Sequence, residues 1–236
     1  MNEKRRSILA AAGVTLLAGV NSVWGQNRVK IGVIGSGRVG GTIGGLWVKA
    51  GYDVMFSARD IGEVKELVAG LGPNAHAGTP REAAAFGDVV LISVPYAALP
   101  QIGRDNAAEL KGKVVLDTCN PIAGRDGDMA VAARAKGTGV ASVELLPGVR
   151  LVRAFNCVGY TSMRSEAHRA GERLAIPLAA DDQAALKTAI QLVRDAGFEP
   201  VVVGPLARAR EFDVGTPVFG KSLTARELRS ILALAR

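Results

Sequence analysis

The segment KIGVIGSGRVG, residues Lys30 to Gly40, decides the fold. An apolar strand at 30–34 runs directly into Gly35-x-Gly37-x-x-Gly40, a spacing that is typical of dinucleotide-binding βαβ units. Gly35 permits the tight turn out of the strand, Gly37 has no side chain to block a pyrophosphate, and Gly40 lets the next helix pack close to the sheet. The spacing therefore predicts a phosphate-binding loop at a helix N-terminus.

The residues that follow favour this interpretation over a glycine-rich turn that binds no nucleotide. Apolar side chains recur at helical spacing from Val39 to Ala50, and Gly51 ends the predicted helix. Residues 52–56 then begin a second strand. This is a βαβ start of the expected size.

The rest of the chain alternates between strand and helix patterns. Further strands are predicted at 74–77, 88–95, 113–117, 149–155, 174–178 and 200–204. Helices are predicted at 61–71, from Thr79 and Thr224 with capping boxes, and from Asp181 as a cap to about Ala196. Residues 122–140 have weak periodicity and many glycines, which predicts a loop with at most one short helix. No internal linker is evident, so residues 26–236 are expected to form one α/β domain of the Rossmann type, a doubly wound and mostly parallel sheet.

The N-terminal segment predicts export. Lys4, Arg5 and Arg6 precede the apolar run 7–20, which is short for a membrane span, and small residues before Gln26 fit a cleavage site. The arginine pair followed by Ile8 and Leu9 is typical of a twin-arginine signal, with an ordinary secretory signal or an uncleaved anchor as alternatives. Residues 1–25 are therefore predicted to be a signal peptide, with the mature protein in the periplasm and without a stable membrane span.

Composition narrows the range of partners. The 236 residues are 48% hydrophobic and carry a formal net charge of +7, which favours anionic ligands in general. No run of lysine or arginine is interleaved with aromatic residues, so nucleic-acid binding is not expected. A small molecule is the expected partner.

The end of the second strand indicates which dinucleotide is bound. NAD-specific sites place an acidic residue there, but this chain has Ser57, Ala58 and Arg59. A guanidinium is a good partner for the 2′-phosphate of NADP, the Ser57 hydroxyl is positioned to add a contact, and Arg38 in the glycine loop is a second candidate. A solvated arginine at the end of a strand is the alternative for both arginines. Asp60 is expected to start the next helix.

Few residues are suited to acid–base catalysis. The only histidines, His76 and His168, do not lie at strand carboxyl ends, and neither Tyr96 nor Tyr160 has a lysine four residues later. Hydride transfer between two stacked rings needs position and orientation more than a catalytic side chain. We therefore expect no catalytic side chain and no metal ligand set.

Several motifs in order along the chain resemble the coenzyme F420-dependent NADP oxidoreductases. They span almost the whole mature chain and lie at residues 34–40, 57–59, 94–96, 117–121, 146–148, 153–156, 180–182 and 204–210. In that family a nicotinamide exchanges hydride with a deazaflavin. The resemblance implies NADP as cofactor, coenzyme F420 or a flavin as co-substrate, and a homodimer as a common state.

The resemblance also implies roles for individual residues. Ser36, Gly37, Arg38 and Val39 would hold the pyrophosphate, and Ala58 and Arg59 the 2′-phosphate end. Val94, next to the strand-ending Pro95, and Ala154 would lie at the nicotinamide, whereas Asn120, Pro121 and Asn156 would border the acceptor. The chain departs from the family pattern at Ser57-Ala58-Arg59, where Gly-Ser-Arg is expected, and at Glu63, where a second basic residue is expected.

Two cysteines follow neighbouring predicted strands. Cys119 and Cys157 are expected to lie close together, because each comes just after the carboxyl end of its strand. Export would allow a disulfide to persist, and a pair of buried free thiols is the alternative.

Three functions remain open from the sequence. The first is an NADPH-dependent reductase that acts on a deazaflavin, flavin or similar planar acceptor. The second is a nucleotide-binding module of the cell envelope without turnover, and the third is metal-chelate reduction through a bound flavin.

Overall fold

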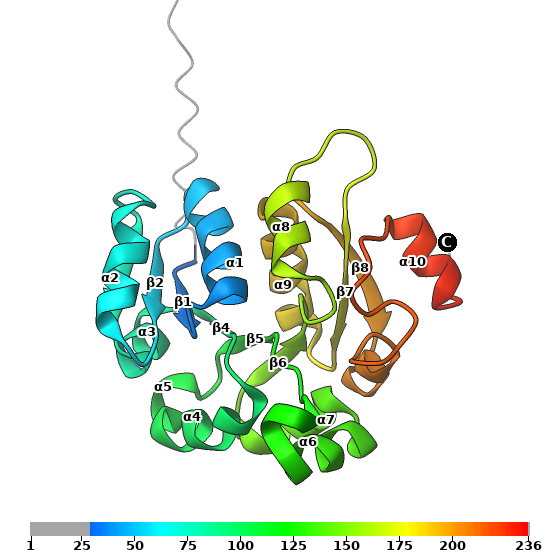
Figure 1. Ribbon diagram of the computed structural model, residues 1–236, viewed down its shortest axis with the longest axis horizontal. Helices are drawn as coiled ribbons and strands as arrows, with labels where there is room; N and C mark the ends of the chain where they lie inside the picture. The colour runs from blue at the N-terminus through cyan, green and yellow to red at the C-terminus, as the bar shows by residue number, and fades with distance from the viewer. Residues whose placement is uncertain (1–28, 236) are drawn as a thin grey trace, which may run out of the picture.

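A computed structural model describes residues 29–235, so the predicted signal peptide lies outside the described residues. One eight-stranded sheet forms the centre of the domain, in the order β3-β2-β1-β4-β5-β6-β7-β8 (Figure 1). The strands are β1 Ile31–Ile34, β2 Val54–Ser57, β3 Ala75–Gly78, β4 Val89–Ile92, β5 Val114–Asp117, β6 Arg150–Arg153, β7 Ala175–Ala180 and β8 Glu199–Gly204.

The first six strands are parallel and have the 3-2-1-4-5-6 order of a doubly wound dinucleotide fold. β7 pairs antiparallel with β6, through Val152↔Ala180 and Arg153↔Ala179, and β8 is parallel to β7. The predicted single, mostly parallel α/β domain is confirmed.

Ten α-helices and two 3₁₀ helices accompany the strands in the described part of the chain. They are α1 Arg38–Lys49, α2 Ile61–Ala69, α3 Pro80–Phe86, η1 Tyr96–Ala98, α4 Leu99–Asp105, α5 Ala107–Leu110, α6 Ala123–Lys136, α7 Thr138–Leu145, α8 Tyr160–Glu166, α9 Gln183–Asp195, η2 Leu206–Glu211 and α10 Ala225–Ile231. The last two of these helices, η2 and α10, follow β8. Both predicted capping boxes are present, at Thr79 with Glu82 and at Thr224 with Glu227. Within residues 29–235, no helix is long and apolar enough to cross a membrane.

Successive strand residues contribute to two apolar cores on opposite faces of the sheet. In β4, Leu91 packs into the core formed with α1 and α9, whereas Val90 and Ile92 pack into the core shared with α3 and α4. Trp47 of α1 is fully buried, and its indole N–H donates to the Leu192 carbonyl of α9 at 2.8 Å. Strands buried on both faces explain the nearly continuous apolar runs in the sequence.

Several boundary predictions were wrong, among them the strand predicted at 88–95, which ends at Ile92. Residues 122–140 are mostly helical, in α6 and the start of α7. The sequence pattern did not reveal these helices, because Gly127 at φ 58° and Gly137 at φ 98° interrupt them and break the apolar period. Asp182 caps α9 in place of Asp181, whose carboxylate accepts the Leu206 N–H at 2.9 Å. β6 ends at Arg153, before the predicted 155.

Two neighbouring glycines of α1 predict opposite effects of alanine on stability. An added Cβ would lie 2.4 Å from the buried Phe56 ring at Gly44, but at an ordinary 3.4 Å from Leu71 at Gly45. Gly45→Ala should therefore raise the free energy of unfolding by up to ~1 kcal/mol through helix propensity. Gly44→Ala should lower it by ~1–3 kcal/mol through overpacking. Urea unfolding measures both, and equal stability of the two variants would contradict this packing of Phe56 on α1.

Candidate functional site

The glycine loop joins β1 to α1 and is tied to both neighbouring strands. Gly35 has φ 95°, and the N–H groups of Gly35 and Ser36 both donate to the Ser57 carbonyl at 2.9 Å. An added Cβ at Gly35 would lie 2.2 Å from the Ser93 carbonyl oxygen, and one at Gly40 only 2.1 Å from the Gly35 carbonyl oxygen. The fold itself therefore requires glycine at these two positions.

Gly37 has a different role from the other two glycines. An added Cβ there would meet no heavy atom within 4 Å, so packing does not require a glycine. Gly37 is the N-cap of α1, no side chain caps this helix end, and its first turn has no acidic residue. The helix therefore begins with open backbone N–H groups and a positive dipole end, which together suit an anion.

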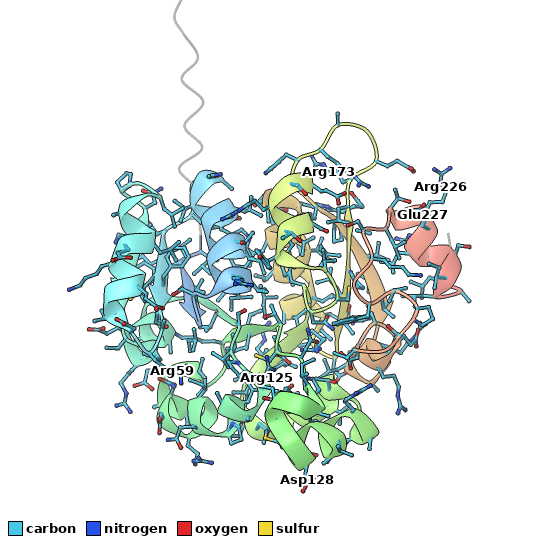
Figure 2. The ribbon with its side chains drawn as sticks, in the orientation of Figure 1. Arg59, Arg125, Asp128, Arg173, Arg226 and Glu227 are labelled. Carbon is cyan, nitrogen blue, oxygen red and sulfur yellow. The ribbon has the colours of Figure 1, made fainter. Side chains whose placement is uncertain are left out.

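The end of β2 differs in part from the prediction. The Ser57 side chain is fully buried and its hydroxyl donates to the Val33 carbonyl at 2.9 Å, so it is not available to a phosphate. Ala58 is partly buried, and Arg59, labelled in Figure 2, is exposed. No ion pair among the described residues includes Arg59. Asp60 caps α2 by accepting the Gly62 N–H at 2.7 Å, as expected for a residue that starts this helix.

Arg38 extends from the glycine loop toward α8. Its guanidinium carbon lies 5.5 Å from the centre of the Tyr160 ring, a cation–π contact. It also lines a hollow of about 290 Å³ along α1, together with Lys49 and Arg164 and without a carboxylate. Positive charge therefore extends from the glycine loop along this helix.

The ends of β4, β5 and β6 form the other half of the site. The Val94 N–H donates to the Cys119 thiol at 3.4 Å, and Pro95 is exposed. The Asn120 side chain donates to the Asn156 carbonyl at 2.7 Å, which joins the β5 and β6 ends. Pro121, Ala154 and Asn156 are buried next to them. The structure thus gathers the predicted residues on one carboxyl edge of the sheet.

The organising residue of this half, Arg153, was missed as a functional residue by sequence reasoning. Its fully buried guanidinium lies 3.0 Å from Asp117 and 2.9 Å from Asp213, two buried carboxylates. It also donates to the Cys119 carbonyl at 2.6 Å and to the Asn120 side chain at 3.0 Å. Burial opposes the charge, but Asp117 and Asp213 outweigh burial and raise the pKa of Arg153. The sequence does place Asp117 and Arg153 at the ends of neighbouring strands, which could have indicated an ion pair. Asp213 lies 60 residues from Arg153, so no local pattern indicates this second partner.

Asn156 is held firmly by the same cluster. Its amide nitrogen donates to Asp213 at 3.2 Å and to the Phe212 carbonyl at 3.3 Å, and its buried Oδ1 has no partner among the described residues. The preceding Phe155 has φ 60°, an uncommon conformation for a bulky residue and one that concentrates at functional sites. Its ring packs edge-on against Trp47 and Phe198.

Both cysteines are free thiols in the structure and both are buried. Burial raises the pKa of Cys157 to about 12 and also raises that of Cys119 well above its usual range. Such thiols act as small apolar side chains rather than nucleophiles.

Tyr96, His76 and His168 are the other side chains with a possible role in acid–base chemistry. Burial raises the pKa of Tyr96 to about 12, and its hydroxyl lies 3.5 Å from that of Ser142. His76 lies 3.6 Å from Asp53, and His168 is exposed. Across residues 29–235, no group of three or more histidine, cysteine or acidic side chains could hold a metal ion.

The first part of the described chain is similar to a known protein family. Residues 30–121 match the family model described as "NADP oxidoreductase coenzyme F420-dependent". The matched segment contains the glycine loop, Arg59 and the β4 and β5 ends. The resemblance deduced from the motifs is thereby confirmed for this part of the chain.

A curated relative is the metalloreductase STEAP3 of Rattus norvegicus. It is 27% identical over 188 residues, which cover 78% of this chain and 36% of the relative. The chain thus spans little more than a third of the length of this relative.

Solved structures share the fold at low sequence identity. A hypothetical protein from Sinorhizobium meliloti has a TM-score of 0.72 and 22% identity, and the match covers 85% of this chain and 98% of that one. A protein from Arthrobacter sp. FB24, described as an F420-dependent NADP reductase, has a TM-score of 0.65 and 20% identity, with 83% and 99% covered. An imine reductase variant from Myxococcus stipitatus, in complex with NAD⁺, has a TM-score of 0.57 and 19% identity, with 78% and 58% covered.

The buried ion cluster predicts a large cost for removing its arginine. Arg153→Met should lower the free energy of unfolding by ~3–5 kcal/mol, because it leaves two carboxylates without their cation. Arg150→Met is the matched control, since its pair with Asp182 is more than a third exposed and such pairs contribute only ~0–1 kcal/mol. Urea unfolding measures both variants. Equal losses of unfolding free energy in the two variants would contradict the conclusion that Arg153 holds the buried cluster together.

Proposed function

We propose that this protein is an NADPH-dependent oxidoreductase that transfers hydride to a deazaflavin, a flavin or a similar planar acceptor. The observation that carries the proposal is Gly37. The protein does not need a glycine there for its own packing, and the residue sits at an uncapped helix N-terminus. That combination fits a pyrophosphate, for which a side chain would be an obstacle.

The residues around the loop fit an NADP molecule. Ser36, Gly37, Arg38 and Val39 would hold the pyrophosphate, and Arg59 with Ala58 would hold the 2′-phosphate end. Arg59 is exposed and has no carboxylate partner among the described residues, so its guanidinium is available to a phosphate. Asp60 is engaged as a helix cap, which removes the nearest acid that could bind the ribose hydroxyls of NAD.

The other half of the site supplies position rather than proton transfer. When bound, the nicotinamide supplies hydride. Val94 and Ala154 would lie against it, and Asn120, Pro121 and Asn156 would border the acceptor. The Arg153 cluster fixes the β5 and β6 ends relative to each other, and this orientation is what transfer between two stacked rings requires.

The acceptor is proposed from resemblance. The matched family model names coenzyme F420, and the rat relative is called a metalloreductase. Metal-chelate reduction through a bound flavin is therefore the second candidate. A nucleotide-binding module without turnover is the alternative from a different class.

We also propose that residues 1–25 form a twin-arginine signal peptide and that the mature protein acts in the periplasm. The support is the sequence of this segment, Arg5-Arg6-Ser7-Ile8-Leu9 followed by an apolar run.

The experiment that tests the function follows NADPH absorbance with purified protein and a panel of flavins, deazaflavins and ferric chelates with flavin. We expect NADPH oxidation with at least one planar acceptor. Gly37→Ala tests the phosphate site separately from folding. The variant should keep the unfolding midpoint of the unmodified protein, because the added Cβ meets no heavy atom, but it should lose nucleotide binding. NADPH binding without oxidation of any acceptor would favour the module without turnover, and no NADPH binding would overturn the proposal.

Arg59 should determine the choice of nucleotide. The protein is expected to bind NADPH more tightly than NADH, and Arg59→Ala should remove most of the difference. A charge-assisted hydrogen bond to a phosphate contributes ~1.5–3 kcal/mol, or about ten- to a hundredfold in affinity. Fluorescence titration of the protein with each nucleotide measures the two affinities. Equal affinity of the unmodified protein for the two nucleotides would contradict the role of Arg59 in nucleotide choice.

A further inference from the structure

Arg125 lies beside the acceptor half of the site and was not singled out by the sequence. It follows the β5 end, in the first turn of α6. Its Nη2 donates to the Asn120 carbonyl at 2.7 Å and to Asp126 Oδ2 at 2.8 Å, and its Nε donates to Asp126 Oδ1 at 3.0 Å. The guanidinium is therefore bound directly to a residue of the candidate site.

Asp126 holds this guanidinium through an ion pair. Its carboxylate is fully buried and also accepts the N–H groups of Ala97 at 3.2 Å and Ile122 at 2.9 Å. Burial opposes its charge, but the hydrogen bonds from Arg125, Ile122 and Ala97 prevail and lower the pKa of Asp126. The pair stays ionised, and it links the loops that follow β4 and β5.

The Nη1 group of the Arg125 guanidinium has no hydrogen-bond partner among the described residues. The Arg125 side chain is 46% exposed. The next acid, Asp128, lies beyond the helix break at Gly127, where φ is 58°. Figure 2 shows Asp128 at the bottom of the view, away from Arg125. No second carboxylate therefore neutralises the Nη1 group.

We propose that Arg125 is a specificity-determining residue that binds an anionic substituent, a phosphate or carboxylate, on the planar acceptor. This inference rests on the proposed function. The guanidinium is already held in place by Asp126 and Asn120, so binding an anion requires little further ordering of the side chain. The two unused N–H groups of Nη1 diverge, so each can donate one charge-assisted hydrogen bond to an oxygen of a phosphate or carboxylate. The acceptor is thereby selected by charge at the Asn120 side of the site.

A binding experiment without turnover tests this selection. Flavin mononucleotide and riboflavin share the same ring and differ by one phosphate, so they separate charge from ring recognition. In the presence of NADP⁺, fluorescence quenching should show flavin mononucleotide binding about tenfold more tightly than riboflavin. Arg125→Gln should bring the two affinities together, mainly by weakening flavin mononucleotide.

Two further variants serve as controls. Arg125→Lys keeps the charge and should retain part of the preference. Arg173→Gln removes the same charge from an exposed loop arginine near α8 and should leave the preference unchanged (Figure 2). If Arg125→Gln does not fold, the unmodified protein still provides a test, because the preference should shrink as salt is raised from about 50 to 500 mM.

Three outcomes would overturn the inference. They are equal affinity of the unmodified protein for the two flavins, no binding of either flavin, and an unchanged preference in Arg125→Gln. Titration of NADPH alone separates these outcomes from failure of the proposed function. Tight NADPH binding together with any of them rejects only the role of Arg125.

Discussion

The buried charge of Arg153 is the interaction on which the β5 and β6 ends of the candidate site depend. A guanidinium with no exposed surface must be paired and hydrogen-bonded, or its burial costs several kcal/mol. Its partners come from three places: the end of β5, the segment that follows it, and Asp213 after η2. Because one cation needs all of these groups at once, they are fixed relative to one another.

The two halves of the candidate site are built by different forces. Steric contact shapes the glycine loop, where Gly35 and Gly40 leave no room for a Cβ. Electrostatics shapes the opposite half, where Arg153 and Arg125 each hold a loop through carboxylates and carbonyls. The first half is thus held by close packing, and the second by ion pairs and hydrogen bonds, of which those of Arg153 are buried. Both halves lie on the carboxyl edge of one parallel sheet, where doubly wound folds bind ligands.

The difference between local and distant determinants explains what the sequence could predict. The glycine loop and the capping boxes at Thr79 and Thr224 are written within a few neighbouring residues, and the structure contains all of them. The Arg153 cluster draws on Asp213, and no local pattern reports a contact over 60 residues. Glycine breaks hid α6 because they interrupt the period on which helix prediction depends. The capping role of Asp182 was missed because two adjacent aspartates compete for one cap.

The contact between Arg153 and Asp213 also sets an order in which the site is completed during synthesis. The glycine loop, Arg59 and the β4 and β5 ends are all present once residue 121 has been made. Arg153, by contrast, gains its second carboxylate only when the chain has grown past residue 213. The nucleotide-binding end also depends on later residues, because the buried Trp47 of α1 donates to the Leu192 carbonyl of α9 and Arg38 lies over the Tyr160 ring of α8. Under the proposed function, both ends of the site are therefore completed only after residue 192 has been made.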